Sequence, residues 1–217
     1  MSCAASRPKS PLRTRMLEDR DYFVLESPEG FLDPESVFGN RAPLHVEIGS
    51  GKGEFLSGYA PLHPDWNFLG FELAEKRIRN ILKKLSPQKH PNVRLLRLKV
   101  DAGIAELLPP VSVRSVYIQH PDPWPKRRHH KRRLVQPDFL AALATVMEPE
   151  AQLHISTDHE EYAHWIGGLL SRQPEFISLQ PELIQSAPSL QDHVSTWYEV
   201  EQRRQGFEPH YLLFQRI

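Results

Sequence analysis

The chain has 217 residues, of which 27 are basic and 27 acidic, so its formal net charge is zero. This length suits one domain, and a hydrophobic content of 40% that includes ten Phe and four Trp is enough for a core. A single cysteine excludes an internal disulfide framework and favours a reducing compartment, and no apolar run reaches the roughly 20 residues of a membrane span. We therefore expect a cytoplasmic protein with no membrane segment.

The N-terminal segment 1–16 contains four basic side chains and no acidic one. It fits a flexible basic arm, an organelle transit peptide or a frayed terminus. Pro8 and Pro11 disfavour the amphipathic helix that a transit peptide needs, so we favour a flexible arm. A single domain is then expected over 17–217.

Strand and helix patterns alternate in the first half of the chain. In order, they predict a strand at 44–48, a short helix at 54–59, a strand at 66–71, a helix with Ile78, Ile81, Leu82 and Leu85 on one face, and a strand at 92–98. Pro87 ends the second helix.

The alternation continues in the second half. A short helix is followed by a strand at 113–118, a helix from Pro137 with Phe139, Leu140, Leu143 and Met147 on one face, a strand at 152–156, a helix through Trp165 and Leu169, a short helix from about Thr196 and a strand at 210–216. Strands alternating with helices indicate βαβ units. We predict an α/β, Rossmann-like doubly wound fold, with a mostly parallel sheet and an antiparallel C-terminal edge strand.

The turn after the first strand contains Gly49, Gly51 and Gly53, which let a ligand approach the backbone closely. NAD-binding proteins carry a similar turn, so the pattern alone is weakly specific. Glu72 follows at the end of the next strand, where an acid can bind ribose hydroxyls. Glu47 would repel a pyrophosphate but suits an ammonium, which favours S-adenosylmethionine over NAD, unless it only pairs with a nearby Arg.

Two more acids follow strands. Asp101 can bind the exocyclic amine of an adenine or cap the next helix, and Asp122 lies just beyond the strand at 113–118. Because the carboxyl ends of parallel strands share one edge of a sheet, we expect Glu47, Glu72, Asp101 and Asp122 to converge there. Four carboxylates would repel one another, and a cationic ligand would relieve this.

A proline-rich loop leads into a cationic block. Asp122 and Trp124 stand between three prolines, which favour an extended conformation. Six of the eight residues from Lys126 to Arg133 are Lys or Arg, which suits a phosphate backbone, although a solvated charged loop is the alternative. His129 and His130 have no second ligand pair at metal spacing, so we expect no metal site.

Five segments together resemble the bacterial tRNA (guanine-N7-)-methyltransferase family over nearly the whole chain. They are VEIGSGKG (46–53), FLGFE (68–72), PDPWPKRRHHKRR (121–133), STD (156–158) and TWYE (196–199). The third is highly specific. The resemblance implies a class I methyltransferase fold and a monomer or homodimer that acts on tRNA. The implied reaction moves a methyl group from S-adenosylmethionine to N7 of a guanosine in the variable loop.

The resemblance also implies roles for individual residues. It assigns the cofactor pocket to the glycine turn with Glu47, Glu72, Asp101 and Asp122, and makes Asp122 the catalytic carboxylate. It assigns substrate contacts to Lys126, Asp158, Thr196, Trp197, Tyr198 and Glu199, and RNA contacts to Arg128, His129, His130, Lys131, Arg132 and Arg133. The chain departs from the family at Trp197, which is usually Lys, and at Gln119 and His120, which are commonly aromatic.

N7 of guanine carries a free lone pair, so the chemistry needs no strong general base. Positioning and electrostatics suffice, and Asp122 would stabilise the positive charge that passes from sulfur to the purine. Asp158 or Glu199 can accept from the N–H donors of guanine, and Lys126 can donate to O6. Trp124 either stacks on a base or packs in the core.

Structural roles compete with two of these assignments. Thr196 and Glu199 have the spacing of a capping box, and Gly206 would end that helix. Asp158 has the position of an N-cap for the helix that follows it. Either role is compatible with a substrate contact.

Three other functions compete with the implied one. A methyltransferase for another RNA, such as ribosomal RNA, would also use the basic block. A non-catalytic RNA-binding protein would not need an intact glycine turn with four placed acids. An NAD-dependent oxidoreductase would have no use for the basic block.

Overall fold

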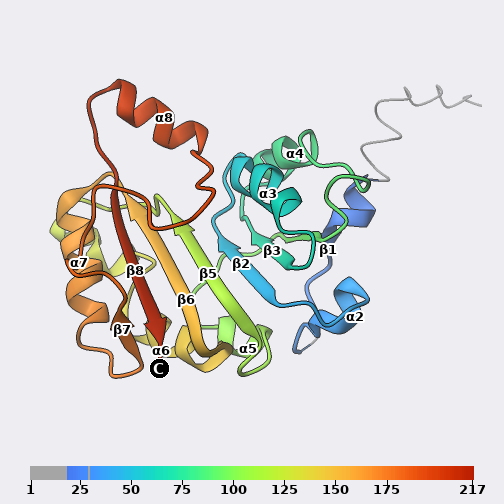
Figure 1. The fold of residues 1–217 in the computed structure, drawn as a ribbon, viewed down its shortest axis with the longest axis horizontal. Helices are drawn as coiled ribbons and strands as arrows, with labels where there is room; N and C mark the ends of the chain where they lie inside the picture. Colours follow the sequence, from blue (N-terminus) through green and yellow to red (C-terminus); the bar gives the residue numbers. More distant parts are fainter. Residues whose placement is uncertain (1–18, 29) are drawn as a thin grey trace, which may run out of the picture.

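The computed structural model describes residues 19–28 and 30–217, so the predicted arm at 1–16 lies outside the described residues. An eight-stranded sheet forms the centre, in the order β1-β4-β3-β2-β5-β6-β8-β7. The first six strands of this order pair in parallel, whereas β8 runs antiparallel to β6 and β7 antiparallel to β8. This confirms the predicted doubly wound, mostly parallel α/β fold (Figure 1).

The strands are β1 (Val24–Leu25), β2 (Leu44–Ile48), β3 (Asn67–Phe71), β4 (Val93–Leu96), β5 (Val113–Gln119), β6 (Met147–Thr157), β7 (Phe176–Ser178) and β8 (His210–Arg216). The helices are α2 (Pro34–Phe38), α3 (Glu54–Tyr59), α4 (Glu75–Leu82), α5 (Ile104–Leu107), α6 (Pro137–Val146), α7 (Glu160–Leu170) and α8 (Trp197–Arg204), with 3-10 helices η1 (Ala60–Leu62) and η2 (Arg127–Arg132). No helix in the described part of the chain is long and apolar enough to cross a bilayer.

Side chains that alternate along the strands build a core on each face of the sheet. Val46 and Ile48 of β2 pack into the core that α5, α6 and α7 cover. Tyr117 of β5 packs into the other core, where α3 and α4 cover the sheet. Glu47 lies between Val46 and Ile48, so its side chain is directed toward the α3 and α4 face.

The C-terminal edge of the sheet differs from the prediction in its outermost strand. The strand predicted at 210–216 is β8, and it is antiparallel as expected, but β7 lies outside it and forms the edge. Because β7 has only three residues, it has too little pattern to predict. Met147 was expected on the face of a helix and instead begins β6, because α6 ends at Val146.

Two further short elements, β1 and α2, are not predicted from the sequence. β1 has two residues and pairs with β4. α2 begins with Pro34 after Asp33, whose side chain accepts hydrogen bonds from the backbone N–H groups of Glu35 and Ser36, and it ends at Gly39 with φ 72°. Asp33 and Gly39 are standard capping residues for the start and end of a helix. The helix has only one turn and no buried residue, so its sequence has no hydrophobic periodicity from which it could be predicted.

Candidate functional site

Three glycines shape the turn between β2 and α3. Gly49, Gly51 and Gly53 have φ values of 82°, 56° and 75°, in the left-handed region that other residues rarely adopt. A Cβ on Gly53 would also come within 2.8 Å of Ile81 in α4. The backbone N–H of Gly49 donates to the carbonyl of Phe71 at 2.9 Å, which anchors the turn to the end of β3.

Glu72 lies between this turn and the start of α4. Its Oε2 accepts a hydrogen bond from the backbone N–H of Gly51 at 2.9 Å, and its Oε1 accepts from Ala74 N–H at 2.8 Å. Arg77 Nη1 lies 3.5 Å from Oε2. The side chain is buried, and each carboxylate oxygen keeps a second lone pair for a ligand hydroxyl.

Glu47 is the most deeply buried acid of the predicted cofactor pocket, with 2% of its surface exposed. Its Oε2 has no hydrogen-bond partner among residues 19–28 and 30–217. Burial, assisted by Glu54 and Glu72, raises the pKa of Glu47 to about 8. A buried acceptor without a donor costs about 1–3 kcal/mol, so a cationic group placed here would be bound favourably.

The strand register brings the remaining two acids to the same edge. β4 lies beside β3 with Leu96 opposite Phe71, and Asp101 follows it. β5 lies beside β2, and Asp122 follows it with an exposed carboxylate. Asp101 Oδ1 accepts from Gly103 N–H at 3.0 Å, which is a turn before α5. The N-cap of α5 is Gly103, so Asp101 is not the expected helix cap, and its side chain remains exposed.

The loop that carries Asp122 is bent rather than extended. His120 and Trp124 on either side of it have φ values of 50° and 42°, although the residue before a proline normally favours an extended conformation. The backbone N–H of His120 donates to Ser156 O at 2.8 Å, which fixes the start of the loop to β6. Left-handed backbone at residues other than Gly costs about 1–3 kcal/mol and gathers at functional sites, which supports Asp122 as a site residue.

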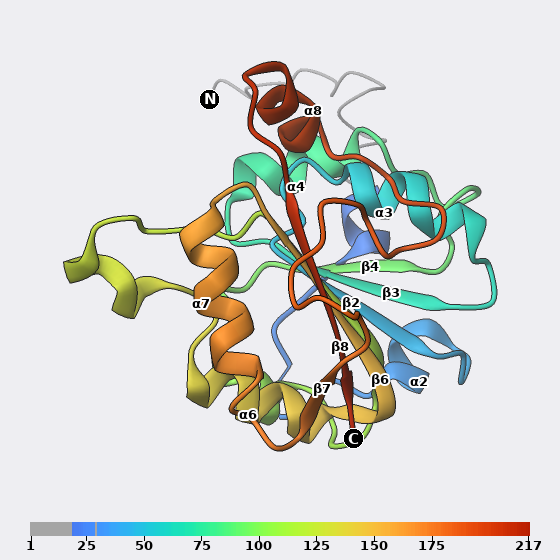
Figure 2. The ribbon, with the colours of Figure 1, turned by 60° about the vertical axis from the view of Figure 1, so that its left-hand side comes forward.

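The cationic block begins just after this loop and forms η2, which projects from the body of the molecule in yellow-green (Figure 2). Trp124 is half-buried beneath it, with the Arg132 guanidinium 5.1 Å from its ring centre and the His129 ring edge-on at 5.7 Å. Trp124 therefore packs against two side chains of the cationic block, Arg132 and His129. The exposed cations are Lys126, Arg127, Arg128, Lys131 and Arg132.

Arg133 does not belong to this exposed set. Its side chain is fully buried and pairs with Glu161, and its Nε donates to Pro123 O at 2.9 Å. Its guanidinium also lies 4.8 Å from the Tyr162 ring and 4.9 Å from the Trp165 ring. This placement contradicts the predicted RNA contact, because the guanidinium holds the loop onto α7 and cannot reach a phosphate.

Asp158 connects the end of β6 to α8. Tyr198 donates its hydroxyl to Asp158 Oδ2 at 3.1 Å, and His120 Nδ1 lies 3.6 Å from Oδ1. Burial raises the pKa of Asp158, but hydrogen bonding to His120 and Tyr198 outweighs it, so the net shift is downward. Asp158 is thus an ionised, half-buried acceptor. The N-cap of α7 is His159, so the anticipated capping role falls to its neighbour.

The buried carboxylate of Glu199 binds two other residues of the C-terminal segment. Glu199 is 2% exposed, and its carboxylate binds the Tyr211 hydroxyl at 2.8 Å and His193 Nε2 at 2.9 Å. Burial alone would raise the pKa of Glu199, but these two partners lower it to about 2. Thr196 Oγ1 accepts from Glu199 N–H at 3.1 Å, which is the helix cap that the sequence predicts.

The first residue of α8 reaches the glycine turn. Lys52 Nζ lies 3.0 Å from the centre of the Trp197 ring, while half of the Trp197 surface remains exposed. Figure 1 shows α8 above the carboxyl ends of β5 and β6, on the edge where the acids gather. Sequence reasoning missed this contact, because the two residues lie in different elements far apart in the chain.

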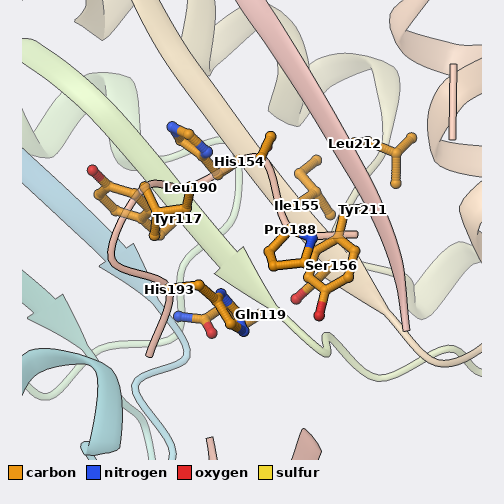
Figure 3. A pocket seen from close by; sticks show the side chains of 11 residues that line it. Tyr117, Gln119, His154, Ile155, Ser156, Pro188, Leu190, His193, Tyr211 and Leu212 are labelled. Atoms are coloured by element: carbon orange, nitrogen blue, oxygen red, sulfur yellow. The ribbon is translucent and has the colours of Figure 1, made fainter. Parts of the chain in front are cut away.

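A small pocket lies beside this edge, between the sheet and the segment 188–193 (Figure 3). Gln119, Ser156 and Tyr211 line it from the sheet, and His193 lines it from the covering segment. Its volume of about 30 Å³ is room for only about two or three water molecules. A purine therefore does not fit in this pocket. Within residues 19–28 and 30–217, no group of three or more His, Cys, Asp or Glu side chains could hold a metal ion.

Comparisons with known proteins find similar sequences. The family described as "Putative methyltransferase" matches residues 41–210. A tRNA (guanine-N(7)-)-methyltransferase of Cutibacterium acnes is 33% identical over 191 residues, which are 88% of this chain and 69% of the relative. The enzyme of the same name from Arthrobacter sp. is 38% identical over 70% of this chain and 48% of its own length, so the chain spans about half of that relative.

Solved structures show the same fold at low sequence identity. The 16S rRNA methyltransferase KamB aligns with a TM-score of 0.60 and 15% identity, over 89% of this chain and 98% of its own. The aminoglycoside resistance methyltransferase NpmB1 aligns with a TM-score of 0.58 and 15% identity, over 86% and 94%. The predicted class I methyltransferase fold is therefore confirmed.

Proposed function

Because the chain belongs to the tRNA (guanine-N(7)-)-methyltransferase family, we propose that it transfers a methyl group from S-adenosylmethionine to N7 of a guanosine in the tRNA variable loop. One observation carries the proposal. An acid-lined glycine turn shares a sheet edge with a projecting cationic segment, and the buried Oε2 of Glu47 lacks a donor within residues 19–28 and 30–217. The first feature suits a cationic methyl donor and the second suits RNA.

The residues present fit S-adenosylmethionine, which when bound supplies an electrophilic methyl group on a sulfonium. Glu47 would accept from its ammonium, where the unpartnered Oε2 needs a donor. Glu72 would accept from the ribose hydroxyls, and Asp101 from the exocyclic amine of the adenine. Gly51 and its two neighbouring glycines would let the ligand lie against the backbone.

Asp122 is the proposed catalytic carboxylate. Its loop is anchored to β6 by His120 N–H and to α7 by Arg133, which supports a fixed backbone position for this residue before the reaction begins. N7 attacks with a lone pair and loses no proton, so no base is needed. A preorganised carboxylate stabilises the positive charge that develops on the purine, which is worth about 10²–10³ in rate.

Asp158 is the better candidate to read the guanine edge. Glu199 is only 2% exposed, and its two oxygens accept from Tyr211 and His193. Asp158 is ionised and less buried; its Oδ2 accepts from Tyr198, while its Oδ1 lies 3.6 Å from His120 Nδ1. An ionised carboxylate accepts from N1–H and the N2 amine of guanine, and adenine offers no such pair of donors. Lys126, exposed beside the loop, would donate to O6.

The exposed cations of η2 would bind the tRNA backbone, with His129 and His130 beside them. His130 is half-buried with its ring 5.4 Å from Trp165, so its contribution would be smaller than that of Arg128, Lys131 or Arg132. We place the activity in the cytoplasm with tRNA as partner. We expect either a monomer or a homodimer, and light scattering of the purified protein would distinguish the two.

The test uses purified protein, unmodified tRNA and labelled S-adenosylmethionine, followed by mass spectrometry of the nucleosides. Labelled N7-methylguanosine from the variable loop supports the proposal. Label in ribosomal RNA but not in tRNA would instead support a methyltransferase for another RNA. Absence of label together with no calorimetric binding of S-adenosylmethionine would leave a non-catalytic RNA-binding protein.

A further inference from the structure

We propose that Lys52 and Trp197 are positioning residues that fix the substrate-binding start of α8 relative to the methyl-donor turn. The inference rests on the proposed function, because it names the contact that aligns the two halves of that site. Lys52 lies in the glycine turn, and its ammonium is 3.0 Å from the centre of the Trp197 indole. The ammonium on the ring face is the geometry of a cation–π interaction, for which Trp is the best partner.

The turn presents Lys52 from a fixed backbone. Gly51 and Gly53 on either side of it are left-handed, and the N–H of Gly51 is held by Glu72. Gly53 packs so closely on Ile81 that a methyl group would not fit. The backbone position of Lys52 is therefore fixed by the turn. Its side chain connects this turn, where the methyl donor would bind, to the Trp197 ring.

The other end of the contact is equally well defined. Trp197 is the first residue of α8, directly after the cap Thr196. The next residue, Tyr198, donates to Asp158, which is the proposed reader of the guanine edge. A continuous chain of contacts thus runs from Glu72 through Gly51, Lys52, Trp197 and Tyr198 to Asp158.

Both partners are too exposed for this contact to serve mainly the core. Lys52 is exposed and half of Trp197 is exposed, so removing either leaves the two buried cores intact. The consequence of removing this interaction should therefore appear in the reaction rate rather than in the stability of the fold. A transfer that requires N7 in line with the methyl group is sensitive to small displacements of α8.

Single-turnover methyl transfer at saturating S-adenosylmethionine and tRNA is the measurement. Lys52→Met keeps the aliphatic stem without the charge, and Trp197→Ala removes the ring. Because both partners are exposed, each should lower the rate roughly 2.5- to 5-fold, the equivalent of about 0.5–1 kcal/mol for a cation–π interaction at an exposed site. The double variant should be no slower than the slower single variant, because both remove the same interaction. Trp197→Phe, which keeps an aromatic face, should be faster than Trp197→Ala and within about twofold of wild type.

Binding measurements separate positioning from direct ligand contact. The Kd of S-adenosylmethionine without tRNA should stay within about twofold in every variant, since the turn itself is unchanged. Val200→Ala, an exposed apolar residue one turn along α8, is the matched control and should leave the rate unchanged. Rates that multiply in the double variant, a rate within about twofold of wild type in Lys52→Met or Trp197→Ala, or a roughly tenfold weaker Kd for the cofactor in Lys52→Met would each overturn the proposal.

The interaction can also be measured without turnover. The Cε protons of Lys52 over an indole face should show an upfield NMR shift that disappears in Trp197→Ala and persists in Lys131→Ala. If the wild-type protein methylated no tRNA, the proposed function would fail while the shift would still show whether the interaction exists. A Lys52 resonance at its ordinary position in wild type would overturn the inference directly.

Discussion

The backbone N–H of Gly51 donates a 2.9 Å hydrogen bond to Oε2 of Glu72. This bond joins the glycine turn after β2 to the end of β3, two elements separated in the chain by α3. Glu72 therefore has two roles, because it shapes the turn and offers lone pairs to a ribose. A change at Glu72 should act on the cofactor both directly and through the turn.

Glu72→Ala should weaken the binding of S-adenosylmethionine by about 1–3 kcal/mol, the range for removing a hydrogen bond to a charged group. Calorimetry of purified protein measures this. Binding of tRNA should be nearly unchanged, since η2 supplies the phosphate contacts. Glu75→Ala removes the same charge from the first turn of α4 and serves as the control. Equal cofactor affinity in wild type and Glu72→Ala would mean that the ribose is held elsewhere.

Asp122→Asn keeps the shape of the side chain and removes its charge. We expect the single-turnover rate to fall about 10²–10³-fold, the effect of removing one preorganised electrostatic group. The affinity for tRNA should change little, because Asp122 is not part of the cationic segment. A rate within about threefold of wild type would show that Asp122 only shapes the loop, and the electrostatic role would move to Asp158.

Arg133→Ala should destabilise the fold by about 2–3 kcal/mol, because a buried guanidinium that donates to Glu161 and Pro123 O is removed. Urea unfolding measures the change. Arg132→Ala is the matched control from the exposed side of η2 and should shift stability by less than about 0.5 kcal/mol. Equal unfolding midpoints for the two variants would contradict the structural role assigned to Arg133.

The salt dependence of tRNA affinity should distinguish the role of Arg132 from that of Arg133. Replacing Lys131 and Arg132 together with Ala should reduce the slope of log Kd against log salt by about 1 for each phosphate that is no longer neutralised. Arg133→Ala should leave the slope unchanged in the fraction that is folded. Filter binding over a range of KCl concentrations gives both slopes. An unaltered slope in the double variant would place the tRNA on another face.

Glu47 should make stability depend on pH. Its folded pKa of about 8 lies above the ordinary value of 4.5, so between these values the folded state binds more protons than the unfolded state. Stability is therefore lost as the pH rises toward 8, by up to about 1.4 kcal/mol per pH unit. The buried His45 and His154, with pKa values lowered to about 3 and about 4, act in the opposite sense, but only below about 6.5.

Urea unfolding at several values from about pH 6.5 to about pH 8 tests this contribution. Glu47→Gln stays neutral throughout and should remove this part of the decline. Saturating S-adenosylmethionine should also reduce the decline in wild type, because an ammonium ligand favours the ionised carboxylate. Parallel pH profiles for wild type and Glu47→Gln would show that Glu47 is already ionised in the free protein.

The sequence alone determined the parts that depend on local chemistry. The strand periods at 44–48 and 210–216 were predicted with the observed bounds, because alternation along a strand is read residue by residue. The positive φ values of Gly49, Gly51 and Gly53 follow from the need for glycine in such a turn. The acids share one edge because parallel strands end there, whatever the details of packing.

Only the tertiary structure decided which side chains meet. Arg133 has the same charge as Arg132 and the next position in the chain, yet it is buried because Glu161 and Trp165 of α7 lie on its side of the loop. Lys52 and Trp197 meet because α8 begins above the glycine turn. Local pattern fixes the direction of the backbone, whereas contacts between distant elements depend on how the whole chain packs. Neighbouring residues with identical chemistry can therefore have opposite roles.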